Sequence, residues 1–289
     1  PPFICWVEIY RRVPPAMSGF NPVGGWGMSW YMRILPYADA APVYNKLTFS
    51  GAHHGWTYSS QAGDPSGDAN ALVLKAADLP WSFCPSSPME KRRDAGNAVI
   101  PNASYQGISG TTNGNGFTNP TSRLANCCGC CGGQQATGVL SSGGMLITLH
   151  ALGIRDCTDG TSNVVMVAEH SNYIRDAAGA PVQVNGTHGI MMGSPNLTRV
   201  EWCPGCMFDR QFNLTTVRYA PNAPAINNDP AWPGIGDNYG SNNPLNSAHT
   251  GGVHGLLTDG SVRFLGNNLD MLTLRRLMSR DDGSPVGEF

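Results

Sequence analysis

Cysteine is the residue type with the most chemistry to offer in this sequence, because six of its nine cysteines fall into two close clusters. The C-x-x-C spacings in both clusters suit a Cys₄ zinc site. Disulfide bonds are the alternative that we favour, because cross-links stiffen a loop-rich region with little core of its own. The disulfide candidates are Cys127, Cys128, Cys130, Cys131, Cys203 and Cys206, and the zinc alternative uses Cys127, Cys130, Cys203 and Cys206.

A redox role for Cys203 and Cys206 is disfavoured, since no thioredoxin-like βαβ pattern surrounds them. The number of cysteines is odd, so complete pairing leaves at least one thiol over. Cys5 lies near the start of the sequence and is the candidate for a bond between subunits, together with its β-prone neighbours Phe3, Ile4 and Trp6. Such a segment is suited to adding a strand to the sheet edge of another copy.

Two histidines and an aspartate near the end of the chain offer a second set of metal ligands. Imidazole suits zinc and carboxylate suits calcium, so His249 and His254 with Asp259 form one candidate site. We favour a structural role, because Asp259-Gly260 separates two β-prone runs and Asp-Gly is a strong hairpin signal. The expected turn has positive φ at both central residues. No cofactor is therefore expected, with structural calcium or zinc as the alternative.

A third group of candidates is the loop that contains His53, His54, Trp56 and Tyr58. Its aromatic rings suit stacking against a sugar ring, although a surface or interface segment explains them as well. Four N-x-[ST] sequons, at Asn102, Asn185, Asn196 and Asn213, permit glycans on a surface protein. About as many would occur by chance in a sequence so rich in Asn, Ser and Thr.

Catalytic motifs are missing from the sequence. It contains no G-x-S-x-G elbow, no H-E-x-x-H helix, no P-loop, and no G-x-G-x-x-G after a predicted strand. Paired carboxylates distant in sequence leave no such local pattern, but nothing points to them. We therefore expect a protein that is not an enzyme.

The composition excludes two further classes of protein. Charged residues make up 13% of the chain and the net charge is −2, with no basic cluster longer than residues 91–93, so nucleic-acid binding is disfavoured. No run approaches the roughly 20 consecutive apolar residues of a membrane-spanning helix. Clustered cysteines suit an oxidising compartment, so we expect an extracellular or cell-surface protein.

The elements that must position these residues follow from local patterns. Helical spacing covers residues 29–35 and 38–47, and a further helix is expected to start at the cap Asp68 and to end before Pro80. Short strands are expected at 103–108 and 164–168, the second buried on both faces. A hairpin over 253–265 precedes a terminal helix capped by Asn268. This order of elements predicts an α+β fold.

Four ordered blocks of the sequence resemble a known family. His249, nine residues and then Asp259-Gly260 are similar to the C-terminal signature of a planctomycete-type prepilin-like family. The block Asp159, Gly160, Thr161, Ser162 and Asn163, leading to Glu169, also agrees with that family. The other two blocks are Ser29-Trp30 with residues 33–37, and residues 83–86.

The resemblance implies a pilin-like globular domain with an antiparallel sheet, a C-terminal hairpin and helix, and long Cys-rich loop insertions. It covers residues 24–289 as a single domain, with a loop insertion at about 109–144 and an N-terminal arm over 1–23. Cys84 and Cys157 lie in two of the family-like blocks, so we expect them to pair with each other. Family members start with a long apolar helix, which residues 1–10 do not contain, so that helix was either removed or is not used.

These observations predict an exported, non-enzymatic structural subunit that assembles with copies of itself into a pilin-like filament or another surface structure. Low charge reduces the repulsion between packed copies. One alternative is a cell-surface module that binds a carbohydrate or a metal. Another is a minor pseudopilin of a secretion system.

Overall fold

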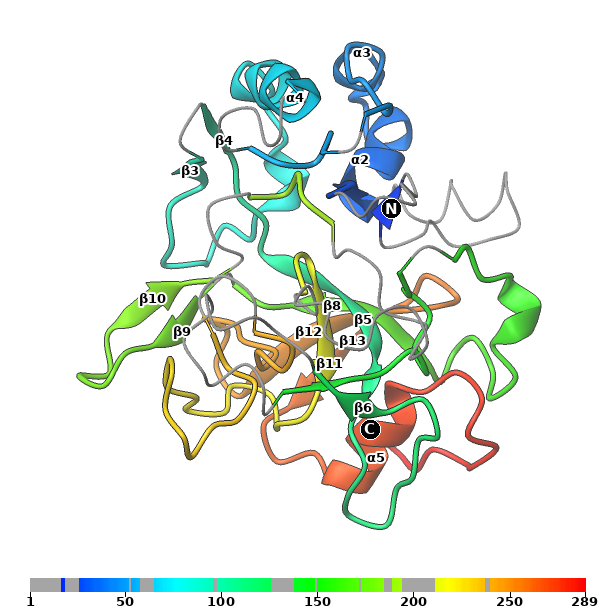
Figure 1. Cartoon of the computed structure of the whole chain (residues 1–289). Helices are drawn as coiled ribbons and strands as arrows, with labels where there is room; N and C mark the ends of the chain where they lie inside the picture. Colours follow the sequence, from blue (N-terminus) through cyan, green and yellow to red (C-terminus); the bar gives the residue numbers. More distant parts are fainter. Residues whose placement is uncertain are drawn as a thin grey trace.

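A computed structural model of the chain describes residues 17–18, 26–51, 53–57, 65–95, 98–125, 138–148, 150–171, 173–184, 189–193, 211–236 and 240–289. A five-stranded sheet lies at its centre. Helices α2, α3 and α4 lie on one side of this sheet and α5 lies on the other (Figure 1). The predicted α+β class is confirmed.

The helices lie close to where the sequence predicts them, but their ends differ. Helix α2 (Trp30–Ile34) runs into the 3₁₀ turn η1 (Leu35–Tyr37), and α3 (Ala41–Tyr44) follows. In α4 (Ser66–Lys75), the residue Asp68 lies in the first turn and not at the cap. Helix α5 (Met271–Leu277) is capped by Asp270 in place of Asn268, because the Asp270 carboxylate accepts a 2.9 Å hydrogen bond from the Thr273 amide.

The central sheet has the strand order β11 (Leu214–Val217), β5 (Tyr105–Thr111), β8 (Val165–Glu169), β12 (Gly252–Leu257) and β13 (Val262–Gly266). The three pairs from β5 to β13 are antiparallel, as expected. Strand β11 instead runs parallel to β5, so the sheet is mixed. Parallel neighbours need a long connection, which the residues between β5 and β11 supply.

Short two-stranded ladders surround the central sheet. They pair β1 (Met17–Ser18) with β2 (Met28–Ser29), β3 (Arg92–Asp94) with β4 (Val99–Pro101), β6 (Arg123–Leu124) with β7 (Val139–Leu140), and β9 (Tyr173–Arg175) with β10 (Pro181–Gln183). The 3₁₀ turns η2 (Pro80–Ser82) and η5 (Ile154–Asp156) complete the elements that are described. The predicted insertion at about 109–144 contains the end of β5 and the β6–β7 ladder. Its cysteines, and Cys5, Cys203 and Cys206, lie outside the described residues.

Strand β8 is buried on both faces, as its continuous apolar sequence predicts. Met166 packs in the cluster that contains α2 and α4 residues. Val165 packs on the opposite face, against a cluster that contains Leu274 and Leu277 of α5. The last residue of β8, Glu169, is also buried.

The predicted hairpin of β12 and β13 is confirmed, but its turn differs from the expected one. Only Gly260 has a positive φ, of 89°, and Asp259 does not. The Gly260 amide donates to the Leu257 carbonyl, and the Leu257 amide donates to the Ser261 carbonyl. This pattern belongs to a three-residue loop with a glycine bulge, which needs left-handed backbone at one position only.

The family-like block at 159–163 braces this hairpin against the end of the chain. The Asp259 amide donates to the Thr161 carbonyl. The Asp159 carboxylate accepts hydrogen bonds from the backbone amides of Asp282 and Gly283, at 2.7 and 2.9 Å. The geometry of Asp159 and Asp259 thus assigns both residues to turns.

The burial of His170 is expected to make the stability of the fold sensitive to acid. It is fully buried, neither ring nitrogen has a hydrogen-bond partner among the described residues, and burial lowers its pKa to about 3. An unfolded histidine has a pKa near 6.5, so below that pH the unfolded chain binds a proton that the folded chain does not. The free energy of unfolding should therefore fall by about 2 kcal/mol from pH 7 to pH 5, and continue to fall towards pH 3.

Guanidinium unfolding at these pH values, in the presence of a chelator, measures this loss. The His170→Asn variant serves as the control and should show a flatter pH dependence than the parent chain. An unchanged pH dependence in that variant would assign the acid sensitivity to other groups.

Candidate functional site

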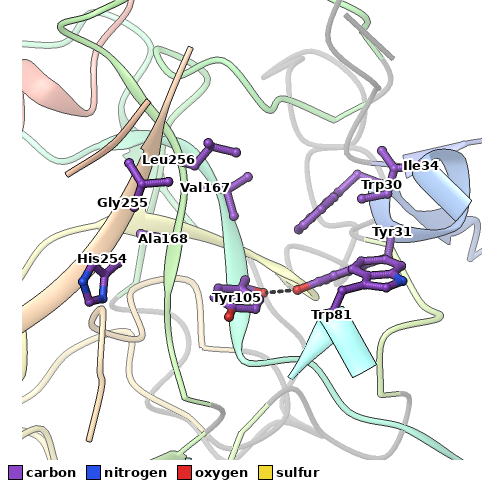
Figure 2. Close-up of a pocket in the computed structure, with 11 residues that line it drawn as sticks. Trp30, Tyr31, Ile34, Trp81, Tyr105, Val167, Ala168, His254, Gly255 and Leu256 are labelled. Atoms are coloured by element: carbon purple, nitrogen blue, oxygen red, sulfur yellow. Dashed lines mark hydrogen bonds between the residues drawn. The ribbon is translucent and has the colours of Figure 1, made fainter. Parts of the chain in front are cut away.

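An open apolar groove separates α2 and η2 from the sheet, with a cavity volume of about 280 Å³. Figure 2 shows Trp30 and Tyr31 of α2 facing Val167 of β8 and Leu256 of β12 across it. The groove brings together segments that are far apart in the sequence. The exposed edge of the sheet and a polar cluster, described below, both lie beside this groove.

The helix side of the groove is a rigid aromatic wall. The rings of Trp30 and Tyr31 stack with centroids 3.8 Å apart, and Trp81 follows at 5.9 Å from Tyr31. The Trp30 indole nitrogen donates to the Asn213 carbonyl at 2.9 Å. The Tyr31 hydroxyl donates to the Tyr105 carbonyl at 2.8 Å (Figure 2), and burial raises the Tyr31 pKa well above its usual value. The wall is therefore uncharged, and Trp30 and Tyr31 are each fixed by a hydrogen bond to the backbone at or beside the sheet.

The sheet side of the groove continues onto an exposed edge strand. Val262 of β13 pairs with Leu256, and Phe264 pairs with His254. Val262 is 57% exposed and Phe264 is 46% exposed. Within the described part of the chain, β13 has β12 as its only neighbour in the sheet. We call Val262 and Phe264 on this strand the β13 edge.

A polar cluster lies beside the groove, at the end of β8. The Cys84 sulfur is 3.7 Å from Nε2 of His249, and that nitrogen is 3.3 Å from Oε1 of Glu169. Cys84 and Glu169 are buried, and the His249 side chain is 34% exposed. We call these three residues the Cys84 cluster.

Backbone contacts hold the segments of this cluster in place. The Ser104 amide donates to the Ser82 carbonyl, and the His170 amide donates to the Ser104 carbonyl. The Ser87 hydroxyl donates to the Ser171 carbonyl at 2.9 Å. The loop that carries Cys84 is therefore tied, on both sides of Cys84, to the residues that directly follow Glu169.

Burial keeps Cys84 and the neighbouring Tyr105 uncharged. It raises the pKa of the Cys84 thiol, and the Glu169 carboxylate adds to that effect. Burial, with smaller effects from Cys84 and Glu169, raises the pKa of Tyr105 to about 12. Both groups are thus protonated near neutral pH in the absence of a cation.

The structure gathers His249 and His254 around Glu169, so the predicted grouping of either histidine with Asp259 is wrong. Asp259 is exposed in the hairpin turn, and its carboxylate accepts hydrogen bonds from the amide and the hydroxyl of Ser261. His249 lies before the other end of β12, a strand of about 20 Å. Glu169 is the carboxylate that the sequence reasoning missed as a site residue.

Cys84 and Cys157 are both free and buried, so the predicted disulfide between them is not formed. The Cys157 thiol contacts Thr258, whose amide donates to the Val164 carbonyl at the start of β8. Cys84 lies at the opposite end of that strand, beside Glu169. The five residues of β8 span about 15 Å, which exceeds the roughly 7 Å between Cα atoms that a disulfide tolerates.

The predicted aromatic platform at residues 53–58 is partly packed inside the protein. His54 is 2% exposed and its Nδ1 lies 2.9 Å from the Gly51 carbonyl oxygen. The Trp56 ring contacts that of Trp26, with centroids 5.5 Å apart. These contacts favour a structural role for His54 and Trp56, while Tyr58 lies outside the described residues.

Comparison with known proteins identifies a family. Residues 8–272 match the sequence model of a family described as protein of unknown function (DUF1559). No curated protein and no solved structure matches the chain. Among the helices of the described residues, none has the length and apolar character needed to cross a membrane.

Proposed function

We propose that this chain is an exported structural subunit. The chain belongs to the DUF1559 family, which is a planctomycete-type prepilin-like family. In this proposal, copies of the chain assemble into a pilin-like filament or another structure at the cell surface. The protein does no catalysis in that role. The β13 edge is the feature of the molecule that supports assembly.

The β13 edge supports assembly because it leaves both apolar side chains and backbone groups available on one strand. Val262 and Phe264 are exposed at an edge that has no further strand among the described residues. Natural proteins usually protect such edges, since an exposed apolar edge pairs readily with another chain. The strand has one charged residue, Arg263, which leaves little repulsion against a second copy.

The occupant that we propose for this edge is the N-terminal arm of a second copy. Phe3, Ile4 and Trp6 are β-prone, so the arm would add a strand beside β13. The side chains on one face of that strand would continue the apolar surface of the groove. Cys5 lies in this arm, so in an oxidising compartment it could form a disulfide with a thiol of another copy.

Removal of residues 1–10 tests this proposal. The full chain should sediment as large particles at concentrations at which the shortened chain is a monomer, while both have the same circular dichroism spectrum. Equal assembly of the two chains would exclude the arm, and a monomeric full chain would favour the surface-binding alternative.

A further inference from the structure

We propose that the Cys84 cluster binds a divalent transition-metal ion, and that zinc is the ion best suited to its donors. One donor atom from each of Cys84, Glu169 and His249 lies within 4.8 Å of the other two. This donor set differs from the metal sites that the sequence suggests, because it uses neither Asp259 nor the clustered cysteines. It joins three segments that are 80 or more residues apart.

The distances between donor atoms fit a tetrahedral coordination shell. Zinc bonds to nitrogen, oxygen and sulfur are about 2.0–2.3 Å long, so tetrahedral ligands lie about 3.3–3.6 Å apart. The Nε2 of His249 lies 3.3 Å from Oε1 of Glu169 and 3.7 Å from the Cys84 sulfur. Two of the three distances between donor atoms therefore already match a tetrahedral shell, and the third, between the Cys84 sulfur and a Glu169 oxygen, is within 4.8 Å.

The charge of the cluster also favours a cation. The Glu169 side chain is 4% exposed, and among the described residues no Lys or Arg forms an ion pair with it. A buried carboxylate needs a partner charge or a metal. A divalent ion would balance the Glu169 carboxylate and the Cys84 thiolate together, because a coordinating thiol loses its proton.

His254 orients the carboxylate for this role. Oε2 of Glu169 accepts a 2.8 Å hydrogen bond from the His254 amide and lies 3.2 Å from Nδ1 of its ring. These contacts turn Oε1 towards His249 and Cys84. Partners of this kind fix a ligand in position, so His254 is a positioning residue.

The donor types select the class of metal. Thiolate and imidazole are poor ligands for calcium and magnesium, which prefer oxygen, but they suit zinc. Three protein ligands leave one position of a tetrahedral shell open. The His249 side chain is 34% exposed, so this position is reached from solvent.

Cobalt(II) titration of the reduced, chelator-stripped full chain tests the proposal, because a tetrahedral cobalt–thiolate site shows a sulfur-to-cobalt band in the near ultraviolet. We expect the parent chain to bind a single cobalt ion and to show that band. The Cys84→Ser variant should lose both the band and the bound ion. Cys157→Ser, which removes the other buried free thiol of the described residues, should retain both. His254→Gln should retain the band with about 10–100-fold weaker affinity.

Two further measurements keep the result unambiguous. Zinc, but not calcium, should bleach the cobalt band and raise the melting temperature of the parent chain, and should leave that of Cys84→Ser unchanged. If Cys84→Ser does not fold, His249→Ala tests the same site through a half-buried residue. A parent chain without the band, a band of equal intensity in Cys84→Ser, or a band lost only in Cys203→Ser with Cys206→Ser would overturn the proposal.

Discussion

Lysine at both positions of the β13 edge is expected to abolish assembly while leaving the subunit folded. Val262 and Phe264 are 57% and 46% exposed, so replacing them removes few contacts within the subunit. Two added positive charges on an edge strand oppose pairing with another chain, which is how many natural edges are protected. At a concentration at which the parent chain is polymeric, Val262→Lys with Phe264→Lys should sediment as a monomer.

Leu72→Lys is the matched control for this pair. Leu72 is 57% exposed, as Val262 is, but it lies on α4, outside the central sheet that contains β13 (Figure 1). This variant should assemble as the parent chain does. Undiminished assembly of the double lysine variant would show that the contact between copies lies elsewhere.

Trp30→Ala is expected to cost about 3–5 kcal/mol of the free energy of unfolding, the typical cost of removing a buried aromatic side chain. Trp30 is 3% exposed, and its ring stacks against Tyr31. Its indole nitrogen also donates to the Asn213 carbonyl, which the alanine leaves without that donor. Equilibrium guanidinium unfolding, followed by circular dichroism, measures the loss.

Two controls separate the contributions to this loss. Trp30→Phe keeps a ring in the wall and should cost less than the alanine variant. Leu72→Ala, at an exposed helical position, should change the free energy of unfolding by no more than about 0.5 kcal/mol. A loss below about 1 kcal/mol for Trp30→Ala would mean that the aromatic wall does not hold α2 against the sheet.

The parts of the fold that the sequence predicts well are those with a local signal. The apolar run of β8 and the position of the last hairpin, though not its turn type, each follow from a few consecutive residues. Helix ends were predicted less well, because several candidate caps compete. Asn268 precedes Asp270 by two residues, but Asp270 caps α5 because its carboxylate accepts a hydrogen bond from the Thr273 amide.

The candidate site was only partly predictable, because it depends on contacts between distant segments. The residue types of His249 and His254 identify them as candidates, but the sequence groups them with Asp259. Glu169 is in fact their neighbour, because β8 pairs with β12 in antiparallel register. The length of β8 separates Cys84, near Glu169 at its end, from Cys157, near its start. The parallel pairing of β11 with β5 likewise leaves no local pattern.

Electron microscopy of native, non-denatured material from cells that make this chain tests the central proposal most directly. Ordered polymers whose repeating unit is this chain are the predicted result, with intact mass under reducing and non-reducing conditions showing whether disulfides join the copies. Dispersed single particles of the mass of one chain, 30.7 kDa, would contradict assembly.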